Sequence, residues 1–141
     1  MGAREYLQQL HALDVRMQQL TEQYTELRAT AATLSATRYD REPVSGSKRP
    51  YGLEKAIIGY LTLAEQLEER RTAFFVIRQQ IITDIQSLSD YRQMQVLYMH
   101  YVLYKPLAVV ADEIGYSLSH VKGMQTKGLA EIQKIINQRE K

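Results

Sequence analysis

Residues 107–132, LAVVADEIGYSLSHVKGMQTKGLAEI, predict two helices joined by a tight glycine turn. In the first helix, apolar residues recur at the spacing that puts them on one face: Leu107, Val110, Ala111 and Ile114. Gly115 follows at the point where a residue with positive φ ends a helix and turns the chain. Ser117 is placed to cap the second helix by accepting a hydrogen bond from an unpaired amide. This order is typical of a helix-turn-helix unit that enters duplex DNA.

The second predicted helix has a packing side and a polar side. Val121 and Met124 supply the packing side, with Leu118 as a further candidate. The outer face is left to Ser119, His120, Lys122, Gly123, Gln125 and Lys127. No acidic residue follows until Glu131. Two amphipathic helices joined by a glycine also occur in all-α proteins without a nucleic-acid role, but the basic outer face favours DNA binding.

The same residues resemble a known domain. Residues 91–136 resemble the C-terminal DNA-binding domain of sigma factors, the fourth conserved region, in which a similar helix, turn and helix read a promoter element. The whole chain resembles the small phage and prophage proteins related to the RinA/ArpU-type late-gene transcription regulators. The sequence has the same order of parts as that family: AREYLQQLHALDVRMQQLTEQYTELR, a Ser- and Gly-containing middle, and YMHYVLYKPLAVVADEIGYSLSHVKGMQTKGLAEI. The resemblance implies a DNA-binding regulator of late transcription.

The sigma-factor resemblance also implies roles for individual residues. Leu118, Ser119, Lys122 and Gly123 stand at places that face bases, and Lys127 stands near a phosphate. Sigma factors have larger charged or amide side chains at the positions of Ser119 and Gly123, so their promoter sequence is not expected here. Because a glycine cannot read a base, direct readout is expected to fall on Lys122, Ser119 and His120. Lys105 is either a phosphate contact or a solvated lysine. The predicted DNA-binding set is Lys105, Ser117, Leu118, Ser119, His120, Lys122, Gly123 and Lys127.

The composition excludes several other classes of protein. The chain has no cysteine, which removes disulfides, thiol nucleophiles and cysteine-ligated zinc. Only seven glycines and three prolines interrupt a chain that is 45% hydrophobic, so helix should dominate. No segment has the apolar length of a membrane span, and the N-terminal residues lack the apolar core of a signal peptide. We expect a protein of the cytoplasm of a bacterial host cell, with no membrane partner.

The charge is unevenly distributed. Residues 1–90 contain eleven Lys or Arg and twelve Asp or Glu, whereas residues 91–141 contain seven and four, so the basic excess lies with the predicted DNA-binding residues. The excess is small, and one such module would neutralise only a few phosphates. Two copies on one duplex would bind more tightly.

A heptad pattern fills the first predicted helix. The seam residues alternate by fours and threes: Tyr6, Leu10, Leu13, Met17, Leu20, Tyr24, Leu27, Ala31 and Leu34. A second long helix begins after residue 52, with an inward face of Leu53, Ile57, Tyr60, Ala64, Leu67, Phe74, Ile77 or Ile81, Ile85 and Leu88. Residues 37–52, TRYDREPVSGSKRPYG, hold two of the three prolines and predict a loop. Together these segments predict a long antiparallel hairpin that resembles a coiled coil.

This hairpin predicts self-association. Apolar residues remain outside its single seam: Ile58, Leu61, Leu63, Phe75, Val76 and Ile82. A free two-helix hairpin would expose them, so another copy or another protein is expected to cover them. We expect a homodimer or a higher oligomer that presents two or more DNA-binding units. The residues assigned to oligomerisation are Leu10, Leu13, Met17, Leu20, Tyr24 and Leu27.

The segment between the hairpin and the glycine turn predicts one more helix. Residues 87–90 are expected to form a flexible tether, and Ser89 or Asp90 can cap the helix YRQMQVLYMHYVLY that follows. Its apolar and aromatic residues recur at helical spacing, which favours core packing over base stacking. Lys105 and Pro106 then end this helix, and the proline suits the first turn of the next one.

Nothing in the sequence favours catalysis. His11, His100 and His120 are far apart in the chain and lack the adjacent carboxylate or second histidine of a metal site or catalytic triad. The glycines form no phosphate-binding loop. We therefore expect no enzyme activity, no cofactor and no metal.

The predicted protein is all-α, with a hairpin and oligomerisation region at residues 1–90 and a sigma-like helix-turn-helix domain at residues 91–141. Its predicted function is sequence-specific DNA binding that activates late or packaging genes, with double-stranded DNA, a second copy and RNA polymerase as expected partners. Two alternatives stay open. A small terminase, the DNA-recognition subunit of phage packaging, also joins a helix-turn-helix to oligomerising helices. A protein-interaction module that binds a sigma factor or RNA polymerase, and does not bind DNA, would have the same helices.

Overall fold

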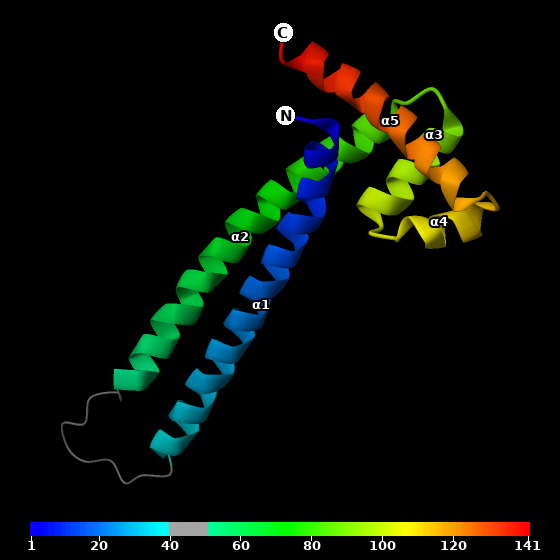
Figure 1. The fold of residues 1–141 in the computed structure, drawn as a ribbon. Coiled ribbons are helices and arrows are strands. Elements are labelled where there is room, and N and C mark those ends of the chain that lie inside the picture. The colour runs from blue at the N-terminus through cyan, green and yellow to red at the C-terminus, as the bar shows by residue number, and fades with distance from the viewer. Residues whose placement is uncertain (40–50) are drawn as a thin grey trace. The chain divides into compact units, whose positions relative to one another are not determined.

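The computed structural model describes residues 1–39 and 51–141, and all regular structure in those residues is helical, which confirms the all-α fold class. Two long helices come first, α1 (Ala3–Tyr39) and α2 (Tyr51–Gln86) (Figure 1). The elements that follow are α3 (Tyr91–Leu97), the π-helical turn η1 (Tyr98–Val102), α4 (Leu107–Ile114) and α5 (Leu118–Arg139).

The loop predicted at residues 37–52 is too long at both ends. Residues 37–39 continue α1, and residues 51–52 already belong to α2. Residues 37–39 include neither glycine nor proline, so no residue type there interrupts the helix. The rest of the predicted loop, residues 40–50, lies outside the described residues.

The chain forms two compact units. We call Val15–Thr72 the hairpin unit, and Met1–Asp14 together with Ala73–Lys141 the head unit. This division differs from the expected boundary at residue 90. The beginning of α1 and the end of α2 belong to the head unit, because their apolar residues share a core with α3, η1 and α5.

The hairpin unit is antiparallel, as expected. The Tyr24 ring on α1 meets the Tyr60 ring on α2 edge to face, with 6.0 Å between their centroids. Further along, a Cβ at Gly52 would lie 3.7 Å from Leu34 Cδ1. Contacts therefore move backward along α2 as they move forward along α1. The buried residues of this unit are Ala31, Leu53 and Ala56, with Leu34, Ile57 and Tyr60 packed against them.

Part of the α1 seam that the sequence assigns to oligomerisation packs within one chain. Leu10 is completely buried in the head core. Leu27 packs on α2, since a Cβ at Gly59 would lie 3.1 Å from Leu27 Cδ1. None of the six assigned residues is exposed, namely Leu10, Leu13, Met17, Leu20, Tyr24 and Leu27. Leu10 and Leu27 are thus covered within the chain and are not free to contact another copy. Exposed apolar surface in the hairpin unit lies instead on Ile58, Leu61 and Val15.

The head unit has a large core to which five elements contribute. Its buried residues are Ala3, Tyr6, Leu7, Leu10, Ile81, Ile85, Leu88, Leu97, Tyr101, Val102, Leu129, Ile132 and Ile136. Leu7 is completely buried although it lies outside the predicted heptad seam. Burying one such leucine contributes roughly 1.5–3 kcal/mol. The residues predicted as a flexible tether also belong here, because Leu88 is buried and Ser87 Oγ donates to the Asp84 carbonyl at 2.6 Å.

A buried carboxylate links three helices of the head unit. Asp84 on α2 is 5% exposed and accepts a hydrogen bond from the Tyr6 hydroxyl on α1. The Arg139 guanidinium on α5 donates to both Asp84 oxygens, at 2.8 and 3.1 Å. A fork of this kind is a strong charge-assisted contact. The hydrogen bond to Asp84 raises the pKa of Arg139 above its usual value. Every polar atom of the buried carboxylate therefore has a partner.

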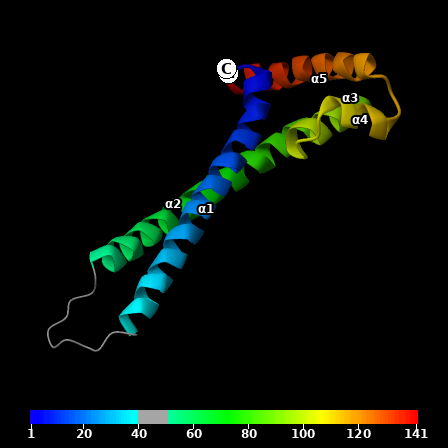
Figure 2. The same ribbon diagram turned by 60° about the horizontal axis from the view of Figure 1, so that its bottom comes forward.

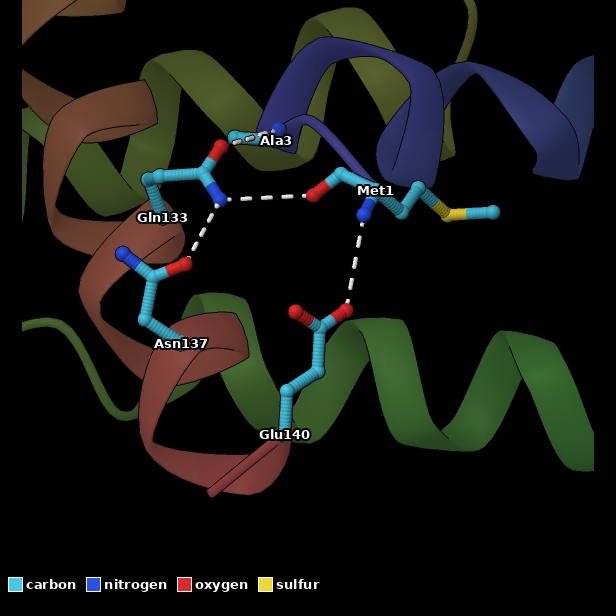
Figure 3. A network of polar contacts seen from close by, with 5 residues as sticks. All are labelled: Met1, Ala3, Gln133, Asn137 and Glu140. Carbon is cyan, nitrogen blue, oxygen red and sulfur yellow. Dashed lines mark hydrogen bonds and ion pairs between the residues drawn. The ribbon is translucent and has the colours of Figure 1, made fainter.

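The N-terminal residues are tied to α5 by a second polar network (Figure 3). The Ala3 amide donates to Gln133 Oε1 at 2.7 Å. Gln133 Nε2 donates to the Met1 carbonyl at 3.3 Å and to Asn137 Oδ1 at 3.1 Å. The terminal amine of Met1 lies 3.4 Å from a Glu140 carboxylate oxygen. These contacts hold the start of α1 against the last turns of α5.

The Tyr6 contact predicts a pH dependence of stability. Burial, together with the hydrogen bond to Asp84, raises the pKa of Tyr6 from 10.0 to about 12. The stabilisation is complete below pH 10 and is lost as the pH rises through the folded-state pKa, because only the neutral hydroxyl is favoured in the fold. Between pH 9 and 11 the wild type should lose about 1 kcal/mol more of its unfolding free energy than Tyr6→Phe. Urea denaturation at both pH values measures this difference.

Tyr91→Phe is the control, because Tyr91 is exposed. Its unfolding free energy should follow the wild type at both pH values. Equal pH dependence in wild type and Tyr6→Phe would contradict the assigned role of Tyr6.

Candidate nucleic-acid interface

A small second core of the head unit builds the helix-turn-helix. Its buried residues are Val96 from α3, Val110 and Ala111 from α4, and Val121 from α5. Partly buried residues surround them: Met99, Leu107, Ile114, Tyr116 and Met124. The apolar residues predicted from the sequence for α4, together with Val121 and Met124, therefore pack as expected. Val96 adds a third helix, so α4 and α5 are held in a three-helix arrangement with α3 (Figure 2).

The turn between α4 and α5 has the predicted geometry. Gly115 adopts a φ of 76°, and its amide donates to the Ala111 carbonyl at 3.0 Å. The Tyr116 amide donates to the same carbonyl at 3.1 Å, as in a glycine-ended helix. Ser117 Oγ then accepts from the His120 amide at 3.1 Å and caps α5. Both sequence predictions, the positive φ at Gly115 and the cap at Ser117, are confirmed.

The first turns of α5 are open to solvent. The exposed members of the predicted DNA-binding set are Ser117, Leu118, Ser119, His120, Lys122, Gly123 and Lys127. Leu118, a candidate for the packing side, is 39% exposed and is not part of either core of the head unit. These seven exposed residues therefore all lie at the N-cap and in the N-terminal turns of one helix, α5.

Gln125 is a correction to the predicted outer face. It is only 6% exposed, and its Nε2 donates to the buried Tyr101 hydroxyl at 2.9 Å. Gln125 lies four residues after Val121, so both share the inward face of α5. The amide is an internal contact between α5 and η1 and is not available to DNA.

Lys105 lies apart from the rest of the set in its contacts. Its Nζ is 2.8 Å from a Glu113 carboxylate oxygen on α4 and also donates to the second oxygen at 3.0 Å. The ion pair bridges the segment before α4 and the end of α4. Binding of a phosphate by Lys105 would compete with Glu113.

Two residues outside the predicted DNA-binding set, Arg92 and Tyr116, pack beside the exposed turns of α5. The Arg92 guanidinium on α3 lies 5.2 Å from the centre of the Tyr116 ring. The Tyr116 ring meets the His120 ring edge to face at 4.7 Å. Arg92 and Tyr116 are far apart in the chain, so no local sequence pattern could reveal this contact. It places the His120 ring against the turn between α4 and α5.

The charges on α5 suit an anionic partner. Within the part of the chain that the structure describes, Lys122 and Lys127 make no ion pair, so both amines are available as donors. A lysine amine can donate to a phosphate oxygen or to the acceptors on a guanine edge. Asp112 and Glu113 lie exposed on α4, outside the α5 surface.

Other features of the described residues are modest. A cleft of about 250 Å³ lies in the head unit, lined by Gln86, Tyr91, Met94, Gln95, Tyr98 and Met99. Among residues 1–39 and 51–141, no three acidic or histidine side chains gather in an arrangement that would hold a metal ion. No described helix is both long and apolar enough to cross a membrane.

Comparison with known proteins found no match to the chain among protein-family models, curated proteins or solved structures.

The turn predicts a stability difference at position 115. Gly115→Ala should lower the unfolding free energy by about 1–2 kcal/mol, because a Cβ is unfavourable at positive φ. Gly115→Asn should lower the unfolding free energy by less, since asparagine tolerates this conformation better than alanine. Urea denaturation of the three proteins tests the order glycine, asparagine, alanine. An alanine variant as stable as wild type would contradict the left-handed turn.

Proposed function

We propose that this protein is a sequence-specific DNA-binding regulator of transcription, of phage or prophage type, that activates late or packaging genes. The observation that carries the proposal is the exposed N-terminal surface of α5 with its free lysines, held by a packed three-helix core. An α-helix presented in this way fits the major groove of B-DNA.

Each part of the α5 surface has a distinct role in this proposal. Lys122 donates to base edges, and Ser119 adds a short donor and acceptor beside it. Lys127, five residues further along α5, contacts a phosphate and positions the helix without reading sequence. The His120 ring, which rests on Tyr116, lies at the edge of the surface nearest the turn.

The resemblance to the fourth region of sigma factors supports the transcriptional part of the proposal. It suggests RNA polymerase as a second partner, contacted while the head unit is bound beside a promoter. The proposed setting is the cytoplasm of a bacterial host cell, where DNA and polymerase are found. The proposal needs no catalysis and no cofactor.

Two copies are part of the proposal. One head unit carries few free lysines and would neutralise few phosphates, so a single copy would bind weakly at physiological salt. Ile58 and Leu61 are 65% and 54% exposed on α2, and a second copy of the chain covering them would bring two head units to one DNA. Half-sites spaced by about one helical turn, or a multiple of it, would suit a two-fold dimer.

The two lysines predict different binding defects. Lys122→Ala should weaken binding to the preferred duplex by about 1–3 kcal/mol and reduce sequence preference, because it removes a base contact. Lys127→Ala should weaken binding to all duplexes about equally and reduce the salt dependence, because it removes a phosphate contact. Selection of duplexes from a randomised pool, followed by titration at several salt concentrations, provides the measurement.

Lys134→Ala is the matched control. Lys134 is an exposed lysine further along α5 that pairs with Glu131, so its removal should leave sequence preference unchanged. If Lys122→Ala and Lys127→Ala both bind as wild type does, α5 is not in the groove, and the protein-interaction alternative is favoured. Reporter transcription from the selected site should depend on Lys122.

Self-association predicts a second, independent result. The wild type should be a dimer at micromolar concentration, and the double variant Ile58→Gln with Leu61→Gln should be a 16.3 kDa monomer with the same helix content. Light scattering and circular dichroism measure mass and fold. Gln23→Ala, an exposed change on α1, should leave the mass unchanged.

The same measurement separates regulation from DNA packaging. A ring of many copies would favour a small-terminase role. A monomeric wild type would contradict the proposed two-fold arrangement.

A further inference from the structure

Gly123 has no role that the fold itself explains. It lies inside α5, on the exposed surface, and glycine is among the least favourable residues for a helix interior. Apart from the adjoining turns of its own helix, no atom would lie within 4 Å of a Cβ at this position. Its φ is not positive, so the backbone conformation does not require glycine either. Alanine would fit here and would favour the helix.

The two other glycines near α5 are explained by the structure. Gly115 supplies the positive φ of the turn. A Cβ at Gly128 would lie 3.0 Å from Leu97 Cδ1 and 3.2 Å from Leu97 Cγ, so any larger residue there would force the Leu97 side chain on α3 to shift. Gly123 has neither requirement. A requirement imposed from outside the chain would explain the glycine.

We propose that Gly123 is a specificity-determining residue, the point at which the backbone of α5 comes closest to the base pairs of the bound duplex. This inference rests on the proposed function. A side chain at position 123 would hold the helix away from the floor of the groove. Its absence lets the base-reading side chains reach their acceptors.

The neighbours of Gly123 suit a close approach. Ser119 and Lys127 precede and follow it by one turn on the same face, and Lys122 is adjacent. Ser119 has a short side chain, and the His120 ring packs on Tyr116, which leaves the space over Gly123 open. The two flanking lysines are long enough to reach bases and phosphates on either side of the contact. The depth to which α5 enters the groove then affects the base contacts of Lys122 more than the phosphate contact of Lys127, because base edges lie deeper than phosphates.

The inference predicts that stability and specificity change in opposite directions. Gly123→Ala should raise the melting temperature by about 2–6 °C, because alanine favours the helix. The same variant should bind the duplex selected by wild type about tenfold more weakly, equivalent to about 1.4 kcal/mol, while its affinity for a scrambled duplex of equal length changes less than about twofold. Gly123→Leu should lose more affinity for the selected duplex than Gly123→Ala does. The full chain is used in every measurement.

Thr25→Ala is the control for stabilisation alone. Thr25 is exposed in the hairpin unit, and its replacement by alanine also favours helix, but it should leave both affinities unchanged. Binding of Gly123→Ala at wild-type affinity and specificity, with Lys122→Ala still defective, would overturn the inference and leave the proposed function intact. Failure of wild type to bind any duplex would overturn both. Lower stability of Gly123→Ala would also overturn it, because an internal role would then exist.

Discussion

The buried face of α5 is the constraint on which the head unit depends. It is continuous along the helix and consists of Val121, Gln125, Gly128, Leu129, Ile132 and Ile136. Val121 belongs to the core of the helix-turn-helix, whereas Leu129 and Ile132 belong to the larger core built with α1 and α2. One helix therefore contributes to both cores of the head unit. Because its inward face is packed over most of its length, the outward residues of its first turns keep a defined direction, which the proposed insertion into a DNA groove requires.

α5 packs closely against α3, and this contact limits how the two helices can be placed. Gly128 and Leu97 pack with so little space that a Cβ at position 128 would lie 3.0 Å from Leu97 Cδ1, and Gln125 adds a buried hydrogen bond to Tyr101 nearby. At the other end of α5, Arg139, whose side chain is 45% exposed, donates to the buried carboxylate of Asp84. Removing Arg139 would leave the buried Asp84 carboxylate without its charged partner, and removing the Tyr101 hydroxyl would leave the buried Gln125 amide without its acceptor, so these polar contacts favour one packing of the helix over others.

The head unit shows how residues distant in sequence build one surface. The exposed turns of α5 carry the proposed donors, but Val96 on α3 positions them and Tyr116 holds His120. The residues proposed to touch DNA are therefore few, and the residues that position them come from three elements. This separation between contact and support is common where a rigid element presents a binding site.

Sequence alone determined the local features of this protein. The positive φ at Gly115, the cap at Ser117 and the apolar spacing of α4 follow from interactions between residues within a few positions of one another, which single sequences encode directly. Tertiary structure alone decided the partners of each buried face. Leu7 and Gln125 are buried by helices far away in the chain, part of the α1 seam packs within its own chain, and the head unit includes the beginning of α1 and the end of α2. A helical spacing pattern shows which side of a helix is buried, but not what covers it, because that depends on how distant segments meet.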